Sequence, residues 1–158
     1  MLNGISTNHY TLSVILKDQE GRVRDKRLMT LVVLATIFSL GHTADHVARD
    51  GLRWPLTLES VPFIIISLVI YAIIGFGLYL YLKNKVGPRF WAIVAGIGVA
   101  FGWLAHFSPF TNQPPQYILR AYESAAAGWL ALGCLVALML VLIIAAIYAG
   151  YLWARSSQ

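Results

Sequence analysis

Charged residues are scarce in this chain. Only 12% of its 158 residues are Asp, Glu, Lys or Arg, and 58% are hydrophobic, whereas soluble domains have about 25% charged residues. A soluble fold of this length could not bury so much apolar surface, and the same composition excludes a disordered chain. The single cysteine, Cys134, excludes a disulfide-stapled secreted scaffold. The class that remains is a polytopic membrane protein, which agrees with a mean hydropathy of +0.68.

The motifs of several common enzyme classes are also missing. No serine stands in a GxSxG context, and no HExxH pair of the metalloprotease type occurs. Gly96, Gly98 and Gly102 lie inside a hydrophobic block, where glycines serve helix packing rather than phosphate binding. Cys134 lies in the middle of another such block, where a reactive thiolate is disfavoured. No motif therefore assigns a reaction or identifies the protein as an enzyme.

Four hydrophobic blocks are present, and each is long enough to cross a bilayer, which takes about 20 apolar residues. We expect the spans at about residues 28–47, 61–82, 90–107 and 125–153. Each span should be a helix, because a segment in lipid must satisfy its own backbone hydrogen bonds and the alternation typical of barrel strands is absent. The sequence therefore predicts an all-α fold, an integral membrane four-helix bundle within a single domain at 28–158.

The basic residues are distributed unevenly between the connections. Nine of the 12 lie before the first span, between the second and third, or after the fourth: Lys17, Arg22, Arg24, Lys26, Arg27, Lys83, Lys85, Arg89 and Arg155. Because cytoplasmic loops carry the excess of Lys and Arg, both termini are predicted to be cytoplasmic, an N-in and C-in topology. The same rule accounts for the net charge of +5, so we expect membrane lipids and no nucleic acid among the partners.

Polar sequence precedes the first span and connects the last two. Residues 1–27 form a short polar leader, predicted to be cytoplasmic, as either a loose tail or a small hairpin. Two short strands alone are marginally stable in water, so both alternatives stay open. The connection at about residues 108–120 contains three prolines, and this stiff loop is expected to cap the outer mouth of the bundle.

Three of the four histidines are predicted to lie at one depth in the membrane. His42 and His46 are one helical turn apart, and Asp45 shares their face. At 1.5 Å per residue, His42 and His46 lie about 21 and 27 Å from the cytoplasmic start of their span. His106 lies about 26 Å beyond Arg89, counted from the same side. All of them fall in the outer third of a hydrocarbon core of about 30 Å, where ionisable groups are costly and usually functional.

A ridge of small residues indicates which way His106 faces. Gly98, Gly102 and His106 are spaced by four residues, so they share one helix face. Small residues mark the places where membrane helices approach closely. We therefore expect His106 to face a neighbouring helix rather than lipid, and the ionisable side chains to converge on the bundle axis.

This pattern predicts a metal site at the outer mouth of the bundle. Neutral imidazoles and an ionised carboxylate are suitable ligands for Zn, Fe, Mn or Cu. The candidate ligands are His42, Asp45, His46 and His106. Glu123 and Glu59 lie a turn or two above the expected membrane boundary and are candidate helpers that could add a ligand, orient a histidine or act as a base. A metal with an open position could activate water or oxygen there.

Three other interpretations stay open at this point. The protein could be a non-catalytic accessory or scaffold subunit, in a homo-oligomer or a larger membrane complex, with Asp45 and Arg49 as a simple i, i+4 ion pair. A b-type haem would need two histidines on facing helices, with His42 or His46 opposite His106. A pH-responsive gate would use the titration of histidine near neutral pH, although the spans hold few other polar residues toward the cytoplasm.

Overall fold

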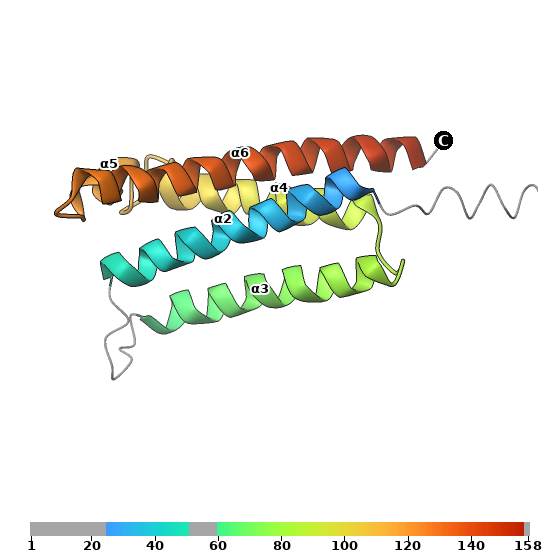
Figure 1. The fold of residues 1–158 in the computed structure, drawn as a ribbon, viewed down its shortest axis with the longest axis horizontal. Helices are drawn as coiled ribbons and strands as arrows, with labels where there is room; N and C mark the ends of the chain where they lie inside the picture. Colours follow the sequence, from blue (N-terminus) through green and yellow to red (C-terminus); the bar gives the residue numbers. More distant parts are fainter. Residues whose placement is uncertain (1–24, 51–59, 157–158) are drawn as a thin grey trace, which may run out of the picture.

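The computed structural model describes residues 25–50 and 60–156, and their regular secondary structure is entirely helical (Figure 1). The helices are α2 (Lys26–Asp50), α3 (Ser60–Leu82), α4 (Pro88–His106), α5 (Pro115–Arg120) and α6 (Ala125–Ser156). No strand occurs within the two described ranges. Most of the leader predicted at residues 1–27 lies outside them, so the choice between tail and hairpin stays a prediction.

Four of these helices are long and apolar enough to cross a membrane. They cover Lys26–Arg49, Val61–Leu82, Pro88–His106 and Ala125–Ser156, and each boundary lies within three residues of the predicted span. The all-α prediction with four helices able to span a membrane is therefore confirmed. The orientation of the termini stays a prediction.

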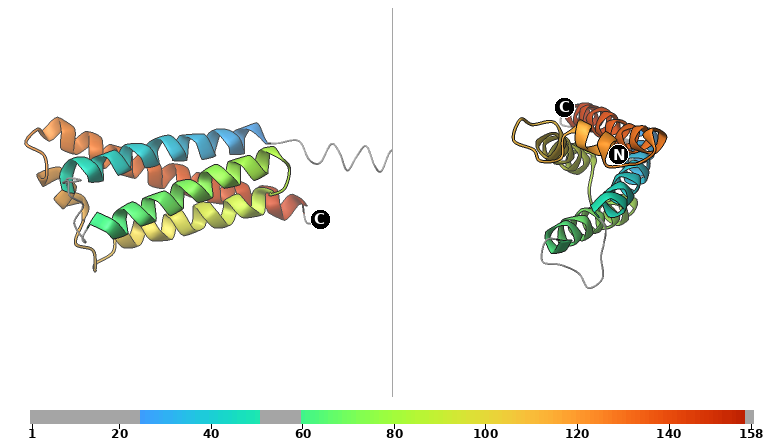
Figure 2. Two further views of the ribbon diagram at one scale, coloured as in Figure 1. Left: turned by 90° about the horizontal axis from the view of Figure 1, so that it is seen from below. Right: turned by 90° about the vertical axis from the view of Figure 1, so that its left-hand side faces the viewer.

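Helix α6 packs against α2, α4 and α5, so it holds these three helices together (Figure 2). A Cβ atom added to Gly98 of α4 would lie 3.2 Å from Leu142 of α6, and one added to Gly102 would lie 2.5 Å from Met139 Sδ. The missing side chains therefore let α4 approach α6 closely. The ridge that ends in His106 faces a neighbouring helix, as its spacing predicted.

Cys134 of α6 packs against α2. A Cβ atom on Gly41 would lie 2.7 Å from Cys134 Sγ, so the glycine allows close approach of these two helices. Because Gly41 directly precedes His42, this contact also fixes the histidine-bearing turn of α2 beside α6. Cys134 is thus a packing residue, which agrees with its position in the middle of a hydrophobic span.

Helix α3 lies at the edge of the bundle, and most of its apolar side chains face outward; Leu68, for example, is 65% exposed. Contacts with α2 and α4 hold it in place. The Tyr71 hydroxyl forms a hydrogen bond with Thr43 Oγ1 of α2 at 2.7 Å, and Gly77 provides the space for the Phe90 ring of α4. Such an exposed apolar surface is suited to acyl chains, which supports a position within a membrane.

The start of α2, the turn between α3 and α4, and the end of α6 lie at one end of the bundle (Figure 1). We call it the basic end, after its described basic residues Lys26, Arg27, Lys83, Lys85, Arg89 and Arg155. Asp25 joins three helices here. Its Oδ1 accepts the Leu28 N–H and its Oδ2 accepts the Tyr148 hydroxyl, each at 2.9 Å, while its own N–H donates to the Tyr81 hydroxyl at 3.0 Å. The carboxylate thus caps α2 and anchors it to α6, and the backbone N–H of Asp25 anchors α2 to α3.

The contact between α5 and α6 can be tested with two glycines of α6. A Cβ atom on Gly128 would lie 2.9 Å from the carbonyl oxygen of Leu119, a backbone atom that cannot rotate away, whereas nothing lies within 4 Å of one on Gly133. We expect Gly128→Ala to destabilise the protein by about 1–3 kcal/mol. The matched control, Gly133→Ala, should stabilise it slightly, because alanine favours helix. Thermal unfolding in detergent measures both, and equal shifts of the two melting temperatures would contradict the packing described.

Candidate metal centre

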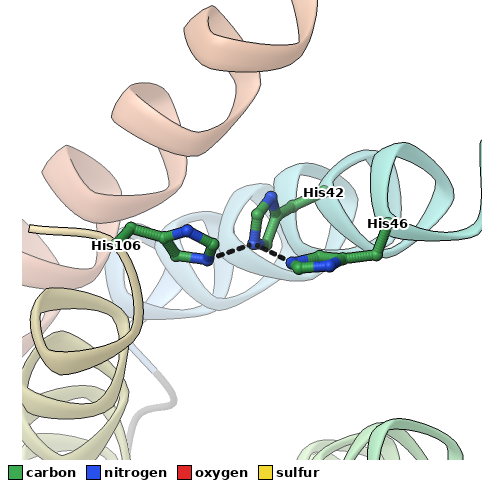
Figure 3. A group of neighbouring side chains, drawn as sticks. All are labelled: His42, His46 and His106. Carbon is green, nitrogen blue, oxygen red and sulfur yellow. Dashed lines mark hydrogen bonds between the residues drawn. The ribbon is translucent and has the colours of Figure 1, made fainter. Parts of the chain in front are cut away.

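Three histidine side chains meet at the end of the bundle opposite the basic end, and Figure 3 shows their rings pointing toward one another. The Nε2 atom of His42 lies 3.1 Å from Nε2 of His106 and 3.2 Å from Nε2 of His46. One nitrogen atom from each ring lies within 4.8 Å of the other two. The prediction that imidazoles from two different spans converge is confirmed. We call these residues the histidine triad.

The local structure explains why the triad forms. His42 and His46 are one turn apart on α2, and their ring centroids are 4.6 Å apart. His106 is the last residue of α4 and only 4% exposed, because it continues the ridge of small residues that packs against α6. The ring of Phe63 in α3 lies against His46, with centroids 5.1 Å apart. Three helices therefore contribute side chains to the surroundings of the triad.

A hydrogen bond fixes which ring nitrogen of His106 carries the proton. Its Nδ1 lies 3.1 Å from the carbonyl oxygen of Gln113, which can only accept, so Nδ1 donates and Nε2 of the neutral ring holds a lone pair. Gln113 is itself held by Thr111, whose hydroxyl accepts the Gln113 N–H at 3.0 Å and donates to the carbonyl oxygen of Ala105. This turn therefore orients the Nε2 lone pair of His106 toward the other two rings.

His42 lies between the other two rings, and hydrogen bonds alone cannot satisfy it. A neutral imidazole nitrogen offers either one proton or one lone pair in the ring plane. Nε2 of His42 nevertheless has two nitrogen neighbours, and its Nδ1 is buried without a hydrogen-bond partner within residues 25–50 and 60–156. A cation shared by the three Nε2 atoms would complete this arrangement.

The spacing of the nitrogen atoms suits a single metal ion. With metal–nitrogen bonds of about 2.0–2.1 Å and tetrahedral angles of about 109°, two nitrogen ligands lie about 3.3 Å apart. The distances from His42 Nε2 to its two neighbours, 3.1 and 3.2 Å, are close to this value. Two of the three nitrogen pairs thus have the separation that a transition metal requires, and the third pair lies within 4.8 Å.

Asp45 lies beside the triad and not within it. Its buried carboxylate accepts two hydrogen bonds from Arg49 at 2.8 Å and one from the Tyr122 hydroxyl at 2.7 Å. Oδ2 lies 3.7 Å from Nδ1 of His42, the ring nitrogen that is not part of the triad. The i, i+4 pair with Arg49 expected from the sequence is present, but its side chains are only 3% and 0% exposed. The role of Asp45 as a metal ligand stays a prediction.

The connection between α4 and α6 contributes three contacts around the triad. Gln113 accepts the hydrogen bond from His106, the Tyr117 ring lies 5.4 Å from the guanidinium carbon of Arg49, and Tyr122 donates to Asp45. The loop therefore covers this end of the bundle, as its prolines predicted. We call residues 108–122 the cap.

The cap contains the short helix α5, which the sequence analysis did not predict. Pro115 occupies its first turn, where a missing N–H removes no helical hydrogen bond and the fixed φ favours helix. Ile118 is completely buried against Ala131 and Leu135 of α6. This apolar contact docks the cap on α6 and places Tyr117 and Tyr122 on the side of Arg49 and Asp45.

The sequence analysis named some of the remaining residues around the triad and missed others. Glu123 is exposed, and Glu59 lies outside the described residues, so the helper roles assigned to them stay predictions. Gln113, Tyr117 and Tyr122 were missed. Gln113 acts through its backbone carbonyl, which no side-chain pattern indicates, and the two tyrosines resemble the aromatic residues common at membrane boundaries.

The buried ion pair next to the triad gives a test of stability. Asp45→Leu or Arg49→Leu alone leaves one uncompensated buried charge, and each should cost about 3–5 kcal/mol. The double variant Asp45→Leu/Arg49→Leu should lose less than either single one, because no charge remains to be paired. Unfolding of all three in the same detergent measures this coupling. Additive losses would mean that the two side chains do not depend on each other.

No protein-family model, no curated protein and no solved structure matches the chain. The function is therefore inferred from the geometry of the triad.

Proposed function

We propose that this chain is an integral membrane metalloprotein that holds one transition metal ion with His42, His46 and His106. The observation that carries the proposal is the meeting of three Nε2 atoms, with His42 only 3.1 and 3.2 Å from its neighbours. The distribution of basic residues supports an orientation with the basic end and both termini in the cytoplasm. The metal site would then lie at the outer mouth of the bundle.

The donor set narrows the choice of metal. Imidazole suits Zn, Cu and Fe, whereas Mn prefers oxygen ligands. Because the Asp45 carboxylate is already bonded to Arg49 and Tyr122, the triad is a set of nitrogen donors, which favours Zn, Cu or Fe over Mn. Three protein ligands are typical of sites that keep a fourth position open, and such a metal supplies Lewis-acid chemistry when bound.

Residues around the triad would orient its ligands. Metal-bound histidines usually donate their second ring N–H to a carbonyl or carboxylate oxygen. His106 has this partner in Gln113. For His42 the candidate partner is Asp45, whose Oδ2 lies 3.7 Å from the buried Nδ1. Asp45 is therefore proposed as a positioning residue that acts on the metal through His42, held in place by Arg49 and Tyr122.

The haem alternative fits the distances less well. Two axial histidines on one iron lie on opposite faces of the ring, so their ligating nitrogens are about 4 Å apart. The Nε2 atoms of His42 and His106 are only 3.1 Å apart, which favours a single ion over a porphyrin between them.

The scaffold alternative is supported by the buried Asp45–Arg49–Tyr122 network, because such a network also stabilises a site without metal.

Metal analysis of the full chain, purified in detergent without chelator, tests the proposal. We expect close to one metal ion per chain, and its loss in His42→Ala and in His106→Ala, since two nitrogen ligands cannot hold it at the same affinity. The matched control is His9→Ala, which removes the fourth histidine and should retain the metal. A folded wild-type protein that binds no Zn, Cu or Fe, even after incubation with each, would leave the scaffold function in its place.

The role of Asp45 can be separated from direct ligation by cobalt substitution. Asp45→Asn keeps the shape of the side chain and should weaken metal binding about 10–100-fold, the usual effect of losing an outer-shell carboxylate. The visible spectrum of bound Co²⁺ should keep its shape, because the three nitrogen ligands are unchanged. A spectrum altered to that of a different ligand set would identify Asp45 as a direct ligand instead.

A further inference from the structure

A groove lies between α2 and α6, next to the basic end and far from the triad. Its volume is about 330 Å³, and it is lined by Arg27, Thr30, Leu31, Ile144 and Tyr148. The two helices pack against each other, so the groove is a surface depression along their contact. Its walls are almost wholly apolar, so Arg27, Thr30 and Tyr148 line it mainly with their carbon atoms.

The polarity of the groove changes along the helices. Arg27 is the second residue of α2 and its side chain is exposed at the basic end. Leu31 and Ile144 lie about one turn, or 6 Å, further into the spans than Arg27 and Tyr148, and Ile144 is 52% exposed. A cation at the end of a span followed by an apolar wall matches the order of phosphate and acyl chain in a phospholipid.

The charges around Arg27 favour an anion. The basic end carries six basic residues within the described ranges, and its acidic residue there is Asp25. Both oxygens of the Asp25 carboxylate accept hydrogen bonds, from the Leu28 N–H and from the Tyr148 hydroxyl. An exposed guanidinium among other basic residues is suited to bidentate binding of phosphate oxygens.

We propose that this groove binds an anionic phospholipid. The Arg27 guanidinium pairs with the phosphate, and an acyl chain lies along Leu31 and Ile144 in the space between α2 and α6. The surrounding basic residues favour a headgroup with a net negative charge over a zwitterionic one. The site is independent of the histidine triad, which lies at the other end of the bundle.

Native mass spectrometry of the detergent-purified full chain, titrated with phosphatidylglycerol and with phosphatidylcholine, tests this site. Phosphatidylglycerol should bind more tightly, and Arg27→Gln should weaken its binding about fivefold, the effect of one basic residue near an anionic headgroup. The matched control is Arg155→Gln. It removes a charge from the same end, where Arg155 donates to the Tyr151 hydroxyl at 3.0 Å, and should weaken binding much less than Arg27→Gln does.

A second variant tests the acyl-chain part of the groove without changing any charge. Ile144→Trp fills the space beside Leu31 and should weaken binding of both lipids, whereas soluble glycerol phosphate should not compete with phosphatidylglycerol. Equal losses in Arg27→Gln and Arg155→Gln would indicate diffuse attraction and overturn the proposal. Equal affinity for the two lipids would also overturn the proposal, and so would unchanged lipid binding in Ile144→Trp. If Arg27→Gln does not fold, the Ile144→Trp result decides by itself.

Discussion

The buried ion pair between Asp45 and Arg49 determines the structure around the triad. Neither side chain is more than 3% exposed, and a single unpaired charge at this depth would be strongly destabilising. The carboxylate also accepts the Tyr122 hydroxyl, and the guanidinium lies over the Tyr117 ring. Both tyrosines belong to the cap. Satisfying the two charges therefore closes the cap over this end of the bundle.

The same cap also orients the nitrogen donors. The Gln113 carbonyl oxygen accepts the Nδ1 proton of His106, and the Tyr122 hydroxyl holds Asp45 beside Nδ1 of His42. Two of the three imidazoles are thus in contact with groups whose positions depend on a single loop. Because rotation of a ring changes the direction of its lone pair, the cap supplies the preorganisation that a metal site needs.

Local sequence properties predicted the spans and the shared face of His42 and His46, since hydropathy and the 3.6-residue period depend only on neighbouring residues. The approach of His106 to these two histidines was predicted from its depth in the membrane, because helices that cross one bilayer bring residues at equal depth together. The position of Asp45 relative to the triad could not be predicted from spacing. Both His42 and Arg49 share a helix face with Asp45. The carboxylate pairs with Arg49, because the guanidinium donates two hydrogen bonds to it at once. Its contact with Tyr122 spans 77 residues and depends on how the cap folds.

The charge balance at this end has a consequence for any metal bound there. Asp45 and Arg49 neutralise each other, and the three imidazoles are neutral ligands, so these five side chains together supply no net negative charge to a divalent ion. A positive charge in a region of low dielectric is costly unless it is compensated nearby. An anionic fourth ligand would supply this compensation directly at the metal. The triad is therefore better suited to a metal that binds an external anionic or ionisable ligand than to a closed structural site.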